Sequence, residues 1–75
     1  MSQQKQDKFL NGLSKRIADI RRQKGFTQER LAELSEIDRV ALANIETGRR
    51  RPTVTTLYKL SQALDIKVEE FFKGI

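Results

Sequence analysis

The sequence predicts an all-α domain of five short helices, and three features of the chain support this fold class. Apolar residues recur at spacings of three and four, as in Leu10, Leu13, Ile17 and Ile20, which is the period of an amphipathic helix. Three residues that can cap a helix stand immediately before such apolar stripes: Thr27, Asp38 and Thr53. The single proline, Pro52, falls between two stripes. With 75 residues, the chain is long enough for one domain.

Short polar loops separate the expected helices. We place the helices at residues 9–24, 28–35, 39–47, 54–64 and 68–73. The preceding segment, residues 1–8, is rich in Gln and Lys and lacks periodicity, so it is expected to be a flexible arm. The helical domain would then cover residues 9–75.

The second and third expected helices begin with the same pair of signals. Each has a cap residue and, around it, two apolar residues five positions apart, which is the spacing of a hydrophobic staple. These residues are Thr27 with Phe26 and Leu31 in one helix, and Asp38 with Ile37 and Leu42 in the other. The first of the two helices also has Ala32 and Leu34 on its apolar side. Because the connection is short, the second helix must project across the first, as in a helix-turn-helix that places one helix in a DNA groove.

The charge balance allows two interpretations. Fifteen Lys and Arg against ten acidic residues give a net charge of +5 and a pI near 10.0. This composition fits a solvated surface as well as a nucleic-acid partner. The basic residues are clustered, which favours the nucleic-acid partner: Lys15, Arg16, Arg21, Arg22 and Lys24 lie in the first expected helix, and Arg49, Arg50 and Arg51 follow the third.

Several classes of function are disfavoured by what the sequence lacks. It has no Cys and no His, which removes the commonest metal ligands and the commonest neutral-pH base. It also has no Gly-rich phosphate loop, so we expect no enzymatic activity, no metal and no cofactor. No apolar run approaches the ~18 residues of a membrane-spanning helix, and the N-terminus is too polar for a signal peptide. We therefore expect a cytoplasmic protein with no membrane partner.

A family resemblance extends over residues 13–72. The chain contains the runs TQERLAE, IDR, IETG, RRRP and LYKLSQALDIKVEEFF at the spacings of the XRE-like helix-turn-helix domains of the Cro and phage-repressor type. Within this family it most resembles the controller proteins of restriction–modification systems. It differs from them at positions 40–43, where they usually carry more polar or aromatic residues, and at Glu36, where the family usually has Gly. The resemblance implies a lambda-repressor-like fold in a bacterial or phage protein associated with the nucleoid.

The third expected helix is the candidate reader of DNA bases. Leu42 and Ile45 are expected to face inward, which leaves other residues for the outer side. The predicted base contacts are Arg39, Val40, Ala43 and Asn44. Arg in the first turn of such a helix can donate two hydrogen bonds to guanine. Val40 and Ala43 could meet thymine methyl groups or simply permit close approach, and Asn44 could bind adenine or a phosphate. The alternative is a surface of small residues with no partner.

Contacts to DNA phosphates are expected beside this helix. The candidates are Gln28, Thr47, Arg49, Arg50, Arg51 and Arg22. The resemblance assigns phosphate contacts to Gln28 and Arg49 in particular. Arg22 could equally serve to balance the negative C-terminal end of its own helix. A basic loop beside a groove helix would add affinity that depends on salt but not on sequence.

The resemblance also implies two structural roles. It pairs Arg21 with Glu46, and it places a two-fold dimer contact at the C-terminal end of the chain. The residues expected in that contact are Phe71, Phe72, Ile75 and Ile66. Phe71 and Phe72 are adjacent on one helix, so only one of the two side chains can face the core of the domain and the other is left exposed.

We therefore predict a transcriptional regulator that binds a palindromic double-stranded DNA operator as a homodimer and has no small-molecule ligand. The alternative is an antitoxin-like module that binds a partner protein as well as DNA. RNA binding stays open, although the stacking aromatic residues that such modules use are missing outside the expected core.

Overall fold

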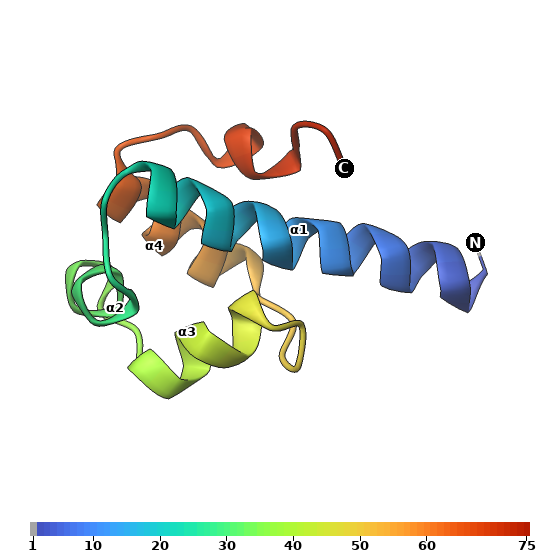
Figure 1. Ribbon diagram of the computed structural model, residues 1–75, viewed down its shortest axis with the longest axis horizontal. Coiled ribbons are helices and arrows are strands. Elements are labelled where there is room, and N and C mark those ends of the chain that lie inside the picture. Colours follow the sequence, from blue (N-terminus) through green and yellow to red (C-terminus); the bar gives the residue numbers. More distant parts are fainter. Residues whose placement is uncertain (1) are drawn as a thin grey trace.

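The computed structural model describes residues 2–75 and is built from helices (Figure 1). The elements are α1 (Gln3–Gln23), α2 (Gln28–Ser35), α3 (Arg39–Glu46), α4 (Val54–Leu64) and the 3-10 helix η1 (Val68–Phe72). The all-α prediction is confirmed for this part of the chain, and the fifth expected helix is a short 3-10 helix rather than an α-helix. None of the helices described is both long and apolar enough to cross a membrane.

Helix α1 begins six residues earlier than predicted. The Ser2 side chain caps it by accepting a hydrogen bond of 3.3 Å from the backbone N–H of Lys5. In the next turn, the Gln3 amide donates to Asp7 Oδ1 at 2.8 Å. The predicted start at residue 9 is therefore wrong, because these polar contacts extend the helix where no apolar stripe marks it. Met1, the first residue of the expected arm, lies outside the described residues.

The predicted caps of α2, α3 and α4 are confirmed. Their side-chain oxygens accept from the third backbone N–H of each helix: Thr27 from Arg30 at 3.0 Å, Asp38 from Ala41 at 3.1 Å, and Thr53 from Thr56 at 3.0 Å. The bounds of α2 and α4 match the prediction, and α3 ends one residue earlier. These caps satisfy amide groups that a helix start leaves unpaired.

The turn between α2 and α3 passes through a left-handed residue. Glu36 has φ 58° and ψ 38°, and the following Ile37 N–H donates to the Ala32 carbonyl at 3.0 Å. A residue with a Cβ in this conformation costs about 1–2 kcal/mol. The sharp turn of the motif is thus retained without the glycine that would adopt it freely, and the domain carries the strain.

The core forms where the helices meet. α1 packs against α3 and η1, while α2 packs against α3 and α4. The buried residues of the core cluster are Leu13, Ile17, Ile20, Leu31, Ala32, Leu42, Ile45, Leu57, Leu60, Leu64 and Phe71. In Figure 1, α1 lies between η1 on one side and α3 on the other, which leaves the outer side of α3 uncovered.

The apolar side predicted for α2 is wrong at one position. Leu34 is 41% exposed, whereas the adjacent Ser35 is buried. The Ser35 hydroxyl donates to the Leu31 carbonyl at 2.6 Å, so its polar group is satisfied within the helix. Leu31 and Ser35 are four residues apart and so share the buried face of α2, and Leu34 is left on the surface.

Candidate nucleic-acid interface

The four residues predicted to contact bases lie on α3. Arg39 and Val40 are exposed, the latter by 57%, and Ala43 and Asn44 are half-buried. Their positions follow the three-to-four-residue repeat of one helix face. The opposite face carries the buried Leu42 and Ile45. The outer surface of α3 is therefore made up largely of Arg39, Val40, Ala43 and Asn44.

A polar network fixes the C-terminal end of α3 to α1 and α2. Arg21 Nε donates to Glu46 Oε2 at 2.7 Å, and Arg21 Nη2 donates to Glu46 Oε1 at 3.1 Å. Glu46 Oε1 also accepts from Gln28 Nε2 at 2.9 Å, and Arg21 Nη1 donates to the Phe26 carbonyl at 2.8 Å. The Arg21 and Glu46 side chains are only 10% and 3% exposed. The structure therefore brings Arg21 and Glu46 together as a buried, bidentate ion pair.

The inclusion of Gln28 in this network was not predicted. Its side chain was expected to face a phosphate, but in the structure its amide donates to Glu46. Gln28 is also the first residue of α2, where backbone N–H groups lack partners within the helix. A hydrogen bond between residues far apart in sequence leaves no signal in local spacing, so the sequence could not indicate this contact.

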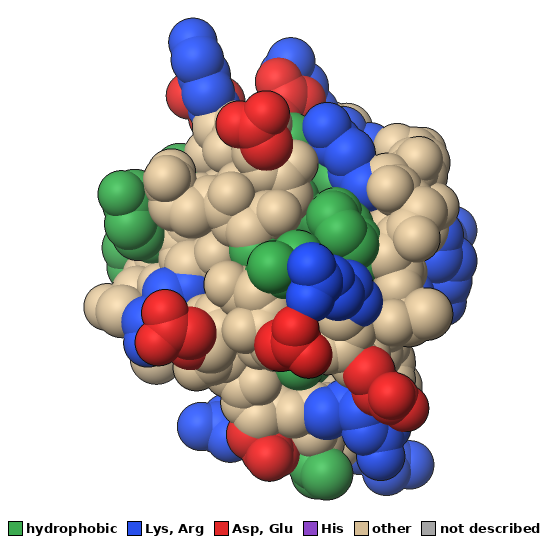
Figure 2. Space-filling view, turned by 90° about the vertical axis from the view of Figure 1, so that its left-hand side faces the viewer, with side chains coloured by type: hydrophobic (Ala, Val, Ile, Leu, Met, Phe, Trp, Pro, Cys, Tyr) green, Lys and Arg blue, Asp and Glu red, His purple; other side chains and the backbone are tan. Residues whose placement is uncertain are grey.

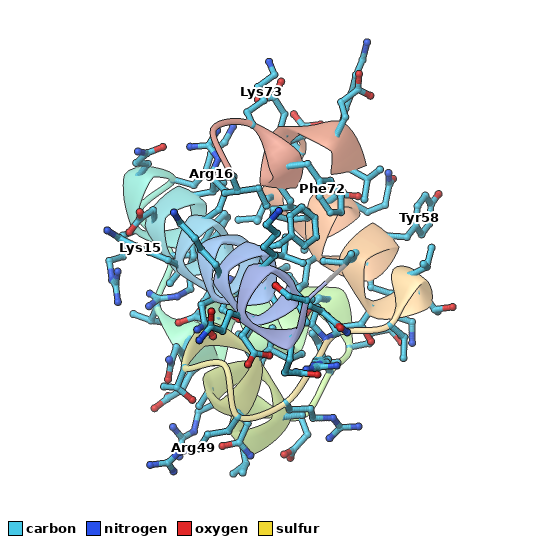
Figure 3. All side chains as sticks on the ribbon, turned by 90° about the vertical axis from the view of Figure 1, so that its right-hand side faces the viewer. Lys15, Arg16, Arg49, Tyr58, Phe72 and Lys73 are labelled. Carbon is cyan, nitrogen blue, oxygen red and sulfur yellow. The ribbon has the colours of Figure 1, made fainter. Side chains whose placement is uncertain are left out.

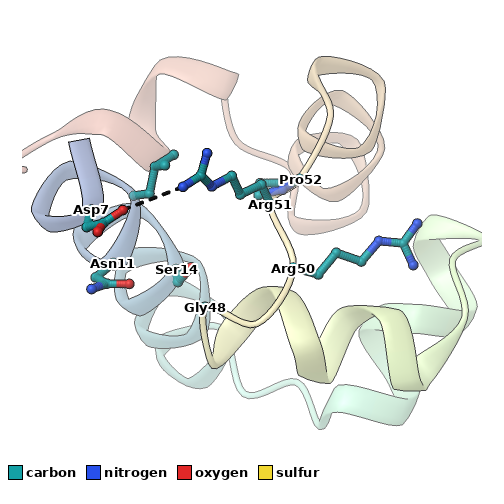
Figure 4. A pocket seen from close by; sticks show the side chains of 8 residues that line it. Asp7, Asn11, Ser14, Gly48, Arg50, Arg51 and Pro52 are labelled. Carbon is teal, nitrogen blue, oxygen red and sulfur yellow. Dashed lines mark ion pairs between the residues drawn. The ribbon is translucent and has the colours of Figure 1, made fainter. Parts of the chain in front are cut away.

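The three consecutive arginines after α3 point in different directions. Arg49 lies at the α3 end of the molecule and extends outward (Figure 3). Arg50 and Arg51 leave the loop on opposite sides, and Arg51 Nη2 lies 3.5 Å from Asp7 Oδ1 (Figure 4). Gly48, with φ 80°, turns the chain, and the N–H groups of Arg49 and Arg50 both donate to the Asn44 carbonyl at 2.9 and 3.1 Å. The loop backbone is therefore anchored on α3, while its charges spread over several surfaces.

The other two expected phosphate contacts already have partners within the chain. The Thr47 hydroxyl donates to the Ala43 carbonyl at 3.1 Å, next to the end of α3. Arg22 lies 3.4 Å from Asp19 Oδ1, and both side chains are exposed. Both residues are accessible to DNA. To bind a phosphate, Thr47 would have to share its hydrogen bond to Ala43, and Arg22 its contact with Asp19.

Charge on the rest of the surface is mixed. On the end of the molecule that carries α2, Lys and Arg side chains are interspersed with Asp and Glu side chains (Figure 2). At η1, Lys73 Nζ donates to Glu70 Oε1 at 2.8 Å, and this hydrogen bond holds the pKa of the Glu70 carboxyl below its ordinary value. Within residues 2–75 no group of acidic residues is arranged to hold a metal ion.

The residues expected at a dimer contact separate into buried and exposed side chains. Phe71 is 0% exposed and belongs to the core, so its assignment to a surface contact is wrong. Phe72 and Ile75 are 38% and 39% exposed, and Ile66 is half-buried against the core. The Phe72 ring stacks on Phe9 of α1, with ring centroids 6.3 Å apart. In Figure 3, Phe72 and Tyr58 lie on the same side of the molecule.

Comparisons with known proteins agree with this geometry. A helix-turn-helix family model matches residues 17–71. The transcriptional regulator y4dJ of Sinorhizobium fredii is 48% identical over 50 residues, which are 67% of this chain and 65% of that protein. The regulator PuuR of Escherichia coli is 40% identical over 58 residues, 77% of this chain but only 31% of that protein. The chain thus spans between about a third and two thirds of the length of these relatives.

A solved structure matches over more of its length. The restriction-modification controller protein C.AhdI from Aeromonas hydrophila superposes with a TM-score of 0.82 and 38% identity, covering 84% of this chain and 96% of that one. The resemblance seen in the sequence is confirmed by these matches. The relatives are transcriptional regulators, a class without enzymatic activity, in agreement with the sequence prediction.

Proposed function

This chain belongs to the helix-turn-helix family of DNA-binding transcriptional regulators, and we propose that it binds a palindromic double-stranded DNA operator as a homodimer. The observation that carries the proposal is the uncovered face of α3. Arg39 and Val40 are exposed on its first turn, the part of a recognition helix that lies nearest the bases. Arg39 donates to the O6 and N7 atoms of a guanine, and Val40 and Ala43 lie against neighbouring bases.

Phosphate contacts flank this face in the proposed complex. Arg49 extends on the α3 side of the molecule and takes the strongest of these contacts (Figure 3). Gln28 contributes its backbone N–H at the start of α2, because its side chain is held by Glu46. Arg22, Thr47, Arg50 and Arg51 add weaker contacts at the edge. The contribution of these groups is independent of sequence and falls with salt.

The dimer forms through the exposed apolar residues near the C-terminal end. Phe72 and Ile75 supply its centre, with Ile66 at the edge. Phe9 is also exposed and stacks on Phe72, so apolar side chains of α1 and of the C-terminal end lie together, and such patches mark interfaces. Two-fold symmetry places the two copies of α3 about 34–36 Å apart, in successive major grooves of the operator.

The biological role that fits best is control of a restriction–modification locus in a bacterium or phage. C.AhdI, a restriction-modification controller protein, matches this chain over 96% of its own length. Occupancy of an operator by such a protein regulates transcription without a bound small molecule. Tight one-to-one binding to the product of a neighbouring gene, in place of self-association, would instead indicate an antitoxin-like module.

Selection from a random double-stranded DNA library tests base reading directly. The purified chain, Arg39→Ala and the control Arg30→Ala are compared at two salt concentrations. Arg30 is an exposed residue of α2 that pairs with Glu33. Because it is also an arginine, Arg30→Ala changes the net charge by the same amount as Arg39→Ala. We expect a palindromic motif for the unaltered chain and for Arg30→Ala, and loss of one base preference in each half-site for Arg39→Ala.

Loss of one bidentate base contact costs about 1–3 kcal/mol of discrimination at that base pair. Salt-sensitive binding with no enriched motif would refute sequence-specific reading. An enriched motif without two-fold symmetry, together with a monomer in sedimentation, would refute the dimer alone.

A further inference from the structure

The first turns of α1 lie beside the basic loop that follows α3. A hollow of about 60 Å³ separates them, and Asp7, Asn11, Ser14, Gly48 and Arg51 are among the residues that line it (Figure 4). Across this hollow Asp7 Oδ1 lies 3.5 Å from Arg51 Nη2, and the same oxygen accepts a hydrogen bond of 2.8 Å from the Gln3 amide. The helical extension that the sequence did not predict therefore ends in a contact with the DNA-facing loop.

This contact distinguishes Arg51 from its two neighbours. Within residues 2–75, neither Arg49 nor Arg50 forms an ion pair, whereas Arg51 is directed to a carboxylate. In Figure 4, Arg51 points toward α1 and Arg50 points the opposite way, along α3. One of the three positive charges of the loop is thus turned toward α1 and paired with a carboxylate.

The ion pair is not needed to shape the loop. The Arg51 and Asp7 side chains are 57% and 50% exposed, and exposed pairs of this kind contribute little to stability. The loop backbone is held by two hydrogen bonds to the Asn44 carbonyl, and Asn11 fills the space beside Gly48, 3.1 Å from where a Cβ would stand. Loss of the Asp7 carboxylate should therefore release the Arg51 side chain and leave its backbone in place.

We propose that Asp7 restrains DNA binding by holding Arg51 in an ion pair that a DNA phosphate must displace. This inference rests on the proposed function. A phosphate near the loop competes with Asp7 for the Arg51 guanidinium. This competition lowers the sequence-independent part of the affinity, and Asp7 is thus a positioning residue that contacts no base.

The test is a double-mutant cycle of Asp7→Asn and Arg51→Gln, measured by equilibrium DNA binding over a range of salt. Asn keeps an oxygen that can accept from Gln3 and removes only the charge. We expect Asp7→Asn to bind more tightly, with a slope of log affinity against log salt that is steeper by up to about 0.9, the value for one additional phosphate contact. Its advantage over the unaltered chain should then shrink by about 3.5-fold between about 50 and 200 mM salt.

The cycle separates this inference from a general effect of charge. In the Arg51→Gln background, Asp7→Asn should change neither affinity nor slope. The control Glu33→Gln removes an acid from another exposed ion pair, with Arg30, and should leave the slope unchanged. Circular dichroism of each variant verifies that the helices are intact, and Asp7→Ser provides a second uncharged variant.

Three outcomes would overturn the inference. These are an unchanged or weaker affinity in Asp7→Asn, a gain that persists without Arg51, and an equal gain in Glu33→Gln. Each of them leaves the proposed function standing, because the unaltered chain still binds DNA. Failure of the unaltered chain to bind any selected DNA would instead refute the proposed function itself.

Discussion

Removing either partner of the buried ion pair between Arg21 and Glu46 is expected to lower the stability of the fold strongly. It joins the last turn of α1 to the last residue of α3, and both side chains are almost fully removed from water. We consider the variants Arg21→Met and Glu46→Met and the double variant that combines them. Met replaces each long side chain with an uncharged one that can still fill the space.

Each single variant leaves one charge buried without its main partner. Arg21 keeps only the Phe26 carbonyl, and Glu46 keeps only the Gln28 amide. Breaking a buried pair in this way costs about 3–5 kcal/mol. A chain of this length has about 4–11 kcal/mol of total stability at about 0.05–0.15 kcal/mol per residue. We therefore expect each single variant to lower Tm by about 12–40 °C, using about 4–8 °C per kcal/mol for small domains.

The double variant should be far less damaged than the sum of the two. It leaves no unpaired charge, and its remaining cost is the loss of partners for the Phe26 carbonyl and the Gln28 amide, about 1–2 kcal/mol. Urea and thermal denaturation followed by circular dichroism measure all four corners of the cycle. Additive effects in the double variant would refute the reasoning, because they would show that the two residues stabilise the fold independently.

Two further predictions concern strain and packing. Glu36→Gly should raise stability by up to about 1.5 kcal/mol, since it removes a left-handed penalty of about 1–2 kcal/mol and adds a glycine entropy cost of about 0.5–1 kcal/mol. Asp65→Gly, at the other non-glycine residue with positive φ, is the control and should gain less, because Asp tolerates this conformation better. Phe71→Ala should cost about 3–5 kcal/mol in denaturation, whereas Phe72→Ala should mainly weaken self-association measured by sedimentation. Equal effects of the paired variants on stability would contradict both arguments.

The sequence located those parts of the fold that depend on neighbouring residues. The caps Thr27, Asp38 and Thr53 act within one helical turn, and they predicted where α2, α3 and α4 begin. The start of α1 could not be found in this way, because residues 3–8 carry no apolar side chain to reveal a period. The sequence also did not show that η1 is a 3-10 helix, because a segment this short gives nearly the same residue spacing in either helix type.

The spacing of neighbouring residues could not predict features that depend on tertiary packing. The sequence showed that one of Phe71 and Phe72 must be buried but not which one. It likewise did not distinguish Arg50 from Arg51, although the path of the loop directs Arg51 to α1. Which Phe is buried and which Arg is paired depend on where elements distant in sequence meet, and this cannot be read from the residues of one segment.

The Arg21–Glu46 network also determines how the proposed DNA-binding surface is held. Glu46 ends α3 and bonds to α1 and to the first residue of α2, so the base-reading helix and the expected phosphate site at Gln28 are fixed relative to each other. The double variant Arg21→Met/Glu46→Met leaves net charge unchanged and removes this connection. At a temperature where it is folded, we expect weaker operator binding with an unchanged salt slope, because geometry is lost while the phosphate-facing cations remain. A shallower slope would mean that Arg21 itself contacts DNA, and unchanged affinity would mean that apolar packing alone orients α3.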